Sequence, residues 1–501
     1  MYHRSIASLV VFYHRYRIPL WFLGAGMLFG VGVVSPFGWV WALFGIAWYF
    51  RALREASTYR TLFWGSYIAW VLKYAVALLW FYTTYPLDWL GLTPGPYQYG
   101  LIALYHVPAA LTLGTGGLLC ALLYALQKKY CDAPKYHILL VPFFVLSEYF
   151  GALVFALYTY GVGGTIGSDF TFGFLGYTLA GHGALLSVAA VGGLTILSFA
   201  LIAVGYCLYV LWMTKRYRLI AVSLGLLLMT SPVSLLPTYA PNTESRVVAM
   251  QMLWPRGTPA EFESLAAEKA AQLQMALVAA SKLDPTHVVL PEDSRLTQGG
   301  DTTATKAYLR TLFPQATVID SARVDNTAFG TVLRTYLYDM KADTVTEFDK
   351  QYLVPQGEYV PFVYQQLISM LPLSPDTKLS LYGTRYQRGI DSRTVAVPAG
   401  TPAILFCFES VTPWGVSRAA ENRSAVPFVA HVVSHGWFQK TPYQLWHQLD
   451  HMLLVQAVSS GLPIVQSANA APAKVYYPDG SIVYPPIQTV APGVGITLIA
   501  L

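Results

Sequence analysis

The chain has 501 residues, of which 55% are hydrophobic and only 12% are charged. A soluble domain carries about 25% charged residues, so this composition excludes a protein that is soluble along its whole length. The net charge of +6 arises in loops between the apolar runs of the first half, so it gives no support to nucleic-acid binding.

Nearly all of the long uncharged runs precede residue 240. A bilayer-spanning helix needs about 20 mostly apolar residues, so we predict a transmembrane helical domain over 1–240. The first run is followed at once by further runs and lacks a small-residue cleavage pattern, so we interpret it as a span and not as a signal peptide. Seven spans are predicted, over 18–34, 37–50, 61–82, 101–126, 137–160, 184–212 and 218–237.

The loops between these runs predict the orientation. Basic residues cluster before span one and after spans two, four and six, whereas 83–100 and 161–183 contain no Lys or Arg. Positive residues stay on the cytoplasmic side, so the N-terminus is expected inside. Seven crossings would then place the second half outside the cytoplasm.

The second half, 241–490, alternates strand-like and helix-like segments. A capping-box pattern at 258–261 opens a helix that is expected to end near 282. This alternation predicts a layered α/β domain. Residues 491–501 are set apart as a C-terminal tail, because their apolar run is too short to cross a bilayer. Strands are predicted at 245–253, 286–290 and roughly 328–339, 403–407, 428–433 and 463–467, with a hairpin turn at 477–481.

Three motifs of this half combine into one candidate site. Glu292 follows the strand at 286–290, Lys350 lies in the segment 348–361, and Cys407 stands at the end of the strand expected at roughly 403–407. Cys407 is the single cysteine of this half, so it has no disulfide partner. Taken singly, such residues are more often a buried thiol, a solvated carboxylate or a surface ion pair. Taken together, a carboxylate, an ammonium group and a thiol indicate a nucleophilic active site.

The chemistry of these groups is complementary. A thiol with a pKa of about 8.5 is mostly protonated at neutral pH, so it needs a base. Glu292 is expected to accept the proton as Cys407 attacks a carbonyl carbon. Lys350 would favour the thiolate and stabilise the oxyanion, with the backbone N–H of Phe408 as a second donor. Glu358 and Glu409 are expected to keep Lys350 protonated.

The segment 350–361, with the core Leu-Val-Pro-x-Gly-Glu-Tyr-Val-Pro, and the run from Cys407 to Glu409 resemble motifs of the apolipoprotein N-acyltransferases. These form the membrane branch of the nitrilase superfamily, and the similarity extends from about 18 to about 485. The resemblance implies an αββα sandwich with a Glu-Lys-Cys triad. It also implies Trp437 and Tyr359 as substrate-binding residues.

By the same resemblance, an acyl chain would pass from a phospholipid to a thioester on Cys407. It would then move to the α-amino group of the diacylglyceryl-cysteine of a lipoprotein. Neither a cofactor nor a metal is expected. The implied protein is a monomer in the inner membrane, with its catalytic domain in the periplasm.

Several positions depart from the family pattern. Ser434-His435-Gly436 stand before Trp437-Phe438 where the family has Asn-Asp, and Tyr352 and Gln356 replace the usual histidine and phenylalanine. The family also has an eighth, C-terminal span. These changes leave the triad intact and leave the acyl acceptor open.

Alternative functions are a membrane-anchored amidase that uses water, an N-acyltransferase acting on a different amine, and a non-catalytic scaffold. Other polar residues also have two interpretations. Lys73 in the third span, with Glu148 as partner, would be a substrate contact or a structural pair. His447 and His451 have a spacing that can bind zinc, but no ligand set is complete, so a solvated helix face is expected.

Overall fold

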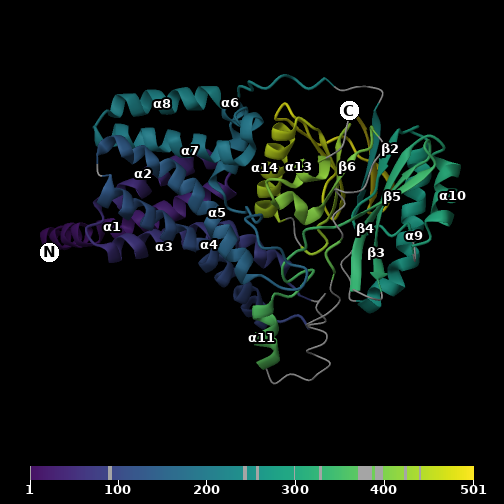
Figure 1. Ribbon diagram of the computed structural model, residues 1–501, viewed down its shortest axis with the longest axis horizontal. Helices are drawn as coiled ribbons and strands as arrows, with labels where there is room; N and C mark the ends of the chain where they lie inside the picture. Colours follow the sequence, from purple (N-terminus) through teal and green to yellow (C-terminus); the bar gives the residue numbers. More distant parts are fainter. Residues whose placement is uncertain are drawn as a thin grey trace.

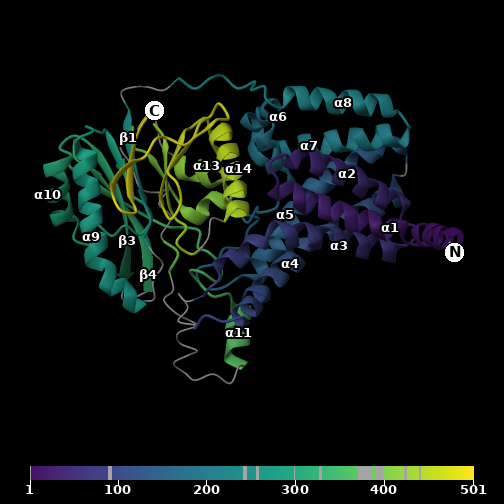
Figure 2. The same cartoon turned by 180° about the vertical axis from the view of Figure 1, so that it is seen from behind.

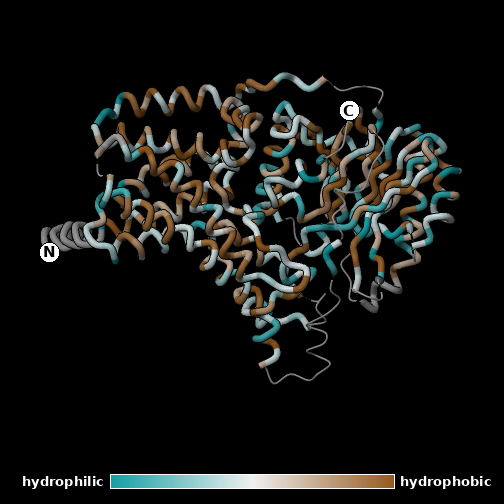
Figure 3. The backbone as a smooth tube through the Cα atoms, in the orientation of Figure 1, coloured by the Kyte–Doolittle hydropathy of each residue, from teal (hydrophilic) through white to brown (hydrophobic). Residues whose placement is uncertain are grey.

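The chain folds into a helical bundle followed by an α/β sandwich (Figure 1). Coloured by hydropathy, the bundle is dominated by hydrophobic residues, whereas the sandwich alternates between the two kinds (Figure 3). The computed structural model describes residues 2–87, 93–131, 133–240, 245–254, 259–297, 300–326, 330–370, 386–389, 399–421, 426–438 and 442–501.

Helices form at all seven places where the sequence predicts spans. In the described part of the chain, five helices are long and apolar enough to cross a membrane. Of the other two, α2 has charged residues in its last turns, and α8, with 14 residues, is about 21 Å long and shorter than the hydrocarbon core. The seven crossings therefore stay a prediction. The helices are α1 (Tyr2–Val34), α2 (Gly38–Glu55), α3 (Tyr59–Ala77) with the 3-10 turn η1 (Leu79–Thr84), α4 (Tyr97–Tyr130), η3 (Pro134–Leu139) with α5 (Leu140–Tyr158), η4 (Leu175–Gly181), α6 (Gly183–Leu186), α7 (Ala189–Met213) and α8 (Tyr217–Thr230).

A buried ion pair and small residues hold the bundle together. A Cβ on Gly26 would lie 2.3 Å from the carbonyl oxygen of Ala69, so α1 and α3 approach each other closely at this glycine. Lys73 of α3 pairs with Glu148 of α5, and both side chains are fully buried. Glu148 also accepts a hydrogen bond from the backbone N–H of Leu175 in η4, at 2.9 Å. The predicted pairing is confirmed, and its burial favours the structural interpretation.

Aromatic rings gather at both ends of the bundle. At one end, the guanidinium of Arg51 lies 4.4 Å from the Trp21 ring and 4.3 Å from the Trp212 ring. At the other end, the rings of Tyr85 and Tyr99 stack with centroids 4.4 Å apart. Tryptophan and tyrosine are enriched where a membrane protein meets the two membrane–water interfaces. The positions of these two groups, at opposite ends of the bundle, are those expected for residues at the two interfaces.

The strands of the second half form two sheets. In the first, β1 and its neighbours β2 and β3 are parallel, and β4, β5, β11 and β12 are added in antiparallel pairings. In the second, β6, β7 and β8 are parallel, and β9 and β10 are antiparallel. The sheets join at one end, where β1 and β8 pair through two residues each. The strands are β1 (Arg246–Met252), β2 (His287–Val289), β3 (Thr317–Asn326), β4 (Gly330–Asp339), β5 (Thr344–Asp349), β6 (Ala403–Phe406), β7 (Val429–Ser434), β8 (Ile464–Asn469), β9 (Lys474–Tyr476), β10 (Ile482–Val483), β11 (Gln488–Ala491) and β12 (Val494–Ala500).

Alternating side chains of these strands build separate hydrophobic layers. Val247 and Ala249 of β1 pack between the two sheets, whereas Val248 and Met250 pack under the helices α9 (Pro259–Ser281) and α10 (Thr302–Leu312). The outer face of the second sheet is covered by α13 (Gly415–Ala420) and α14 (Tyr443–Ser460). Seen from behind, α13 and α14 lie between the sheets and the bundle (Figure 2). The order of layers is αββα, as the resemblance implies.

The remaining sequence predictions are confirmed in part. The predicted strands and the helix after the capping box are present, and Tyr477 N–H bonds to the carbonyl of Ser481 in the expected hairpin turn. Strands β3, β5 and β11 were not predicted, because polar residues interrupt their apolar pattern, and β9 and β10 were implied only as the two arms of the hairpin. The segment 491–501 also differs from the separate tail that was expected. It contains β12, which pairs with β1 along seven residues and so belongs to the first sheet.

Helix α14 attaches the sandwich to the bundle. The Gln448 side chain donates to the carbonyl of Ala77, the last residue of α3, at 2.8 Å. His447 Nε2 lies 3.1 Å from the carbonyl of Ser35, just beyond α1. Helix C-termini leave carbonyl groups without intrahelical partners, so these contacts satisfy them. The solvated face predicted for His447 and His451 is therefore wrong, because α14 packs against the bundle with His447 on Ser35 and the His451 ring centroid 4.1 Å from that of His447. Burial there lowers the pKa of both, and that of His451 to about 3. The part of the chain that is described contains no group of three or more metal-ligating side chains.

Candidate active site

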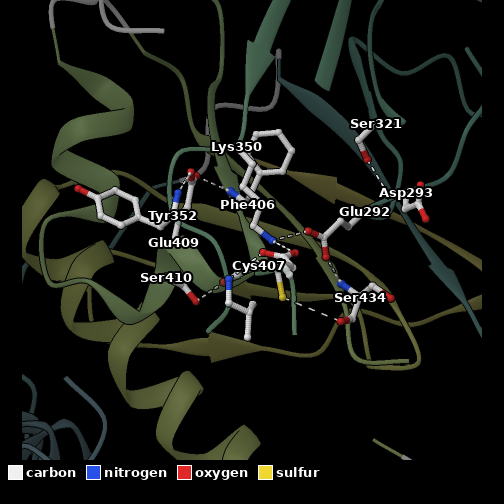
Figure 4. Close-up of polar contacts among 12 residues, drawn as sticks. Glu292, Asp293, Ser321, Lys350, Tyr352, Phe406, Cys407, Glu409, Ser410 and Ser434 are labelled. Atoms are coloured by element: carbon white, nitrogen blue, oxygen red, sulfur yellow. Dashed lines mark hydrogen bonds and ion pairs between the residues drawn. The ribbon is translucent and has the colours of Figure 1, made fainter. Parts of the chain in front are cut away.

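The three candidate residues follow three strands at one end of the sandwich. Glu292 lies just after β2, Lys350 directly after β5, and Cys407 opens the 3-10 turn η6 (Cys407–Val411) directly after β6. The first two strands belong to one sheet and β6 to the other, so the residues meet between the sheets. Figure 4 shows their side chains pointing toward one another. The structure therefore brings together residues that are 58 and 57 positions apart in sequence.

Lys350 is bound by two carboxylates. Its Nζ donates to Glu292 Oε1 at 3.0 Å and to Glu358 Oε1 at 2.7 Å, and all three side chains are buried. Burial opposes the charge of Lys350, but the attraction of Glu292 and Glu358 outweighs it and raises the lysine pKa well above its ordinary value. Lys350 is therefore a fixed positive charge between the two sheets.

Glu292 has the properties of a general base. Burial raises its pKa to about 7, although the nearby Lys350 acts in the opposite direction. Its second oxygen, Oε2, accepts a hydrogen bond from the backbone N–H of Ser434 at 3.1 Å. A base with a pKa near the working pH combines the correct protonation state with a strong drive to accept a proton.

Cys407 is held as a neutral thiol. Its Sγ lies 3.9 Å from the carbonyl oxygen of Ser434, the residue whose N–H binds Glu292 (Figure 4). Burial, followed by the negative charge of Glu292, raises the thiol pKa well above its ordinary value, and Lys350 offsets this only in part. Lys350 was expected to favour the thiolate, but in this arrangement Cys407 stays protonated. Attack by this sulfur requires a proton acceptor.

Glu358 and Glu409 have different contacts. Glu358 binds Lys350 directly, and its other oxygen accepts from the backbone N–H of Val354 at 2.8 Å. The carboxylate of Glu409 instead binds backbone N–H groups: those of Phe406 at 3.0 Å, Gln351 at 2.7 Å and Tyr352 at 3.3 Å. Glu409 was expected to keep Lys350 protonated, but the hydrogen bonds of its carboxylate are to the main chain. It ties the end of β6 to the segment 350–361, called the lysine loop below.

The remaining candidate residues lie around this centre. Phe408 occupies the first turn of η6, where backbone N–H groups have no partner within the helix, which fits its expected role as a donor. Tyr359 is buried, and its hydroxyl donates to the carbonyl of Thr159 at the end of α5, at 3.0 Å. This contact differs from the substrate-binding role expected for Tyr359. Trp437 follows β7 and is half-buried, and its role stays a prediction.

Two contacts of the site were not predicted. Ser434 binds both Glu292 and Cys407 through its main chain, so its residue type carried no signal. His431 of β7 contacts the main chain of Cys407, with Nε2 3.4 Å from the carbonyl of Cys407 and Nδ1 3.2 Å from Oε1 of Gln466. Burial lowers the pKa of His431 to about 4, so the ring is neutral. A histidine inside an apolar strand gave no indication of this position.

Comparison with known proteins agrees with the motifs. The chain is 28% identical to an apolipoprotein N-acyltransferase of Bradyrhizobium diazoefficiens over 213 residues, which are 40% of this chain and 37% of that protein. It is 28% identical over 211 residues to an apolipoprotein N-acyltransferase of Rickettsia prowazekii, covering 40% of this chain and 39% of that one. The chain is similar to apolipoprotein N-acyltransferases. The predicted resemblance is confirmed.

The matched region is shorter than the sequence motifs implied. The alignments span well under half of the length of the relatives, and no family model matches the chain. Among solved structures, two structures of amidase from Nesterenkonia, one described as a mutant of a nitrilase-superfamily amidase, each have a TM-score of 0.32. Their sequence identities are 14% and 15%, and they cover 53% of this chain and 94% and 93% of their own. Scores of this size do not establish a shared fold, so the αββα architecture is supported by the strand pairing above.

Proposed function

We propose that the chain is a membrane N-acyltransferase that carries a fatty acyl group as a thioester on Cys407. One observation carries the proposal. A charged lysine, bound between the buried carboxylates Glu292 and Glu358, lies close to a neutral thiol in a sandwich attached to an apolar helical bundle. The similarity to apolipoprotein N-acyltransferases supports lipoproteins as acyl acceptors and phospholipids as acyl donors.

In the first half-reaction, Cys407 Sγ attacks the ester carbonyl carbon of the phospholipid while Glu292 takes the thiol proton. The negative charge that develops on the carbonyl oxygen is stabilised by Lys350 and by the backbone N–H of Phe408. Collapse of the tetrahedral intermediate breaks the ester bond. The protonated Glu292 returns its proton to the departing lysophospholipid oxygen, and the acyl group remains on sulfur.

In the second half-reaction, the α-amino group of the lipoprotein cysteine attacks the thioester carbonyl. Glu292 accepts a proton from the nitrogen, the carbon–sulfur bond breaks, and the thiolate is reprotonated. Attack by water would release a free fatty acid instead. The burial of Glu292, Lys350 and Glu358 restricts water at this cleft, which favours transfer to the amine.

The proposed location is the inner membrane, with the sandwich on the periplasmic side and the enzyme acting as a monomer. The basic loops of the bundle support this orientation. The contacts of α14 with the ends of α1 and α3 support a site close to the bilayer surface. An acyl chain in the outer leaflet would then need to move only a short way to reach Cys407.

The proposal is tested with the full chain in phospholipid nanodiscs, by intact-mass measurement of the protein. We expect the wild type to gain the mass of one acyl group at Cys407, and Cys407→Ala to gain none while unfolding at the same temperature. Cys207→Ala, which removes an exposed thiol of the bundle, is the matched control and should acylate normally.

Addition of a diacylglyceryl-cysteine peptide should then remove the acyl group from the enzyme and place it on the peptide amine. Release of the acyl group as free fatty acid, with no labelled peptide, would favour the amidase. Turnover by Cys407→Ala would refute the role of the thiol.

A further inference from the structure

A segment of the membrane half reaches into the sandwich. It contacts the lysine loop and the turn η6 that carries Cys407. This segment, 159–174, connects α5 to η4 and is called the strap. On one side it binds the lysine loop and the residue after it, since Tyr359 donates to the carbonyl of Thr159 at 3.0 Å and Phe362 N–H donates to the carbonyl of Tyr160 at 2.9 Å. The bundle is thus in direct contact with the loop that carries Lys350 and Glu358.

The other side of the strap binds the turn that carries the nucleophile. The hydroxyl of Thr171 donates to the carbonyl of Val411, the last residue of η6, at 2.6 Å. The ring of Phe170 lies with its centroid 6.3 Å from that of Phe408, the neighbour of Cys407. The strap therefore touches the two pieces of chain whose spacing sets the position of Lys350 relative to Cys407.

Asp169 is the charged residue at the centre of these contacts. Its Oδ1 accepts from the hydroxyl of Thr412 at 2.9 Å and from Arg418 Nη1 at 3.1 Å. The guanidinium of Arg418 in turn lies 5.1 Å from the ring centroid of Tyr352, in the lysine loop. One carboxylate oxygen thus fixes the residue after the nucleophile turn and, through Arg418, the lysine loop.

An isolated surface ion pair contributes little to the free energy of folding. The contacts of Asp169 are therefore expected to set the relative position of the segments that they join. Asp169 is mostly shielded, with 19% of its side chain exposed, and it serves two donors on the segment that follows η6. A cation over an aromatic ring adds attraction that a simple ion pair lacks. Together these contacts join the strap, the segment after η6 and the lysine loop at one point.

We propose that Asp169 is a positioning residue, which holds the nucleophile turn and the lysine loop at the spacing that lets Glu292 and Lys350 act on Cys407. The membrane half would then take part in catalysis and not only in anchoring. The inference rests on the proposed function for its acylation assay, but its alkylation assay needs no lipid substrate.

The test compares Asp169→Ala, Asp169→Asn and Arg418→Ala in the full chain in nanodiscs. Small displacements of reacting groups can cost up to about a hundredfold in rate, so we expect Asp169→Ala to slow thioester formation by 10- to 100-fold with little change in the half-saturating lipid concentration. Asp169→Asn keeps an acceptor oxygen for Thr412 and should retain an intermediate rate. The matched control is Asp284→Ala, which removes the partner of Arg246 on the exposed surface and should leave the rate unchanged.

A second readout separates positioning from stability. Lys350 lowers the pKa of the Cys407 thiol, so a displaced lysine loop should raise it further. Alkylation of Cys407 by iodoacetamide should therefore need a higher pH in Asp169→Ala than in the wild type, at equal unfolding temperature. The double variant Asp169→Ala/Arg418→Ala should be no slower than the slower single variant, because both act through one chain of contacts.

An Asp169→Ala variant with wild-type acylation and alkylation profiles would overturn the proposal. So would losses that multiply in the double variant. If the wild type forms no thioester at all, the proposed function fails, whereas the alkylation profiles still decide the role of Asp169.

Discussion

The raised pKa of Glu292 makes a specific prediction for the pH dependence of thioester formation. Burial raises this pKa to about 7, and Glu292 accepts a proton only when it is ionised. A group with this pKa is about 10% ionised at pH 6 and about 90% at pH 8, so the rate should rise about tenfold between these values. Activity is therefore gained as the pH rises, and it is lost on acidification.

Glu358→Gln is the perturbation that tests the origin of this pKa. The negative charge of Glu358 raises the pKa of Glu292, and Glu358 also shares Lys350 with it. Its removal leaves Lys350 paired with Glu292, whose pKa should then fall because the attraction to Lys350 favours the ionised form. The rising limb of the rate profile should move to lower pH, and the ratio of the rates at pH 8 and pH 6 should fall below the wild-type value.

The assay is single-turnover thioester formation in nanodiscs, quenched with acid and measured by intact mass across this pH range. Glu347→Gln is the matched control, because it removes a carboxylate that pairs with Arg334 on β4, outside the site. Its profile should equal that of the wild type. A limb that stays in place, or moves to higher pH, in Glu358→Gln would refute the electrostatic coupling argued here.

Two further predictions concern stability. Glu409→Ala leaves three backbone N–H groups without their acceptor, so it should lower the free energy of unfolding by about 3 kcal/mol in denaturant titrations. Glu409→Gln keeps an acceptor oxygen and should lose less. Equal losses in the two variants would contradict the role of Glu409 as an acceptor for these groups. Lys73→Met leaves Glu148 buried without its cation, so it should lower the free energy of unfolding in detergent by about 3–5 kcal/mol. The double variant Lys73→Met/Glu148→Leu should recover much of this loss. A single variant as stable as the wild type would show that the pair is not structural.

The parts of the site that sequence could predict are those that lie next to apolar strands. Glu292 and Cys407 follow runs whose hydrophobic character marks them as buried strands, and a residue at such a strand end is rigidly placed. Five helices of the bundle could also be predicted as spans, because each of their apolar runs is long enough to identify alone.

The missed parts depend on contacts between distant segments. Ser434 acts through its backbone, so no residue pattern could identify it. The apolar run at 491–501 is too short for a span, so the sequence predicts a separate tail there. In the structure this run forms β12, whose backbone groups pair with β1, and such a long-range pairing is not visible in the sequence. Glu409 was expected to act through its charge on Lys350. The sequence spacing did not reveal that the lysine loop folds back and presents its N–H groups to this carboxylate.

These long-range contacts show that segments from both halves of the chain meet around the candidate site. The sandwich supplies the reactive groups, but the segment after Cys407 and the lysine loop are each bound by the strap, through Asp169 and Thr171 on one side and Thr159 on the other. Separate contacts from α14 fix the ends of α1 and α3. If Asp169 positions both segments as proposed, a movement of the bundle relative to the sandwich would change the spacing of Lys350 and Cys407. On this proposal the membrane half is a structural part of the site, and the bilayer around it belongs to the surroundings that hold Glu292, Lys350 and Cys407 in place.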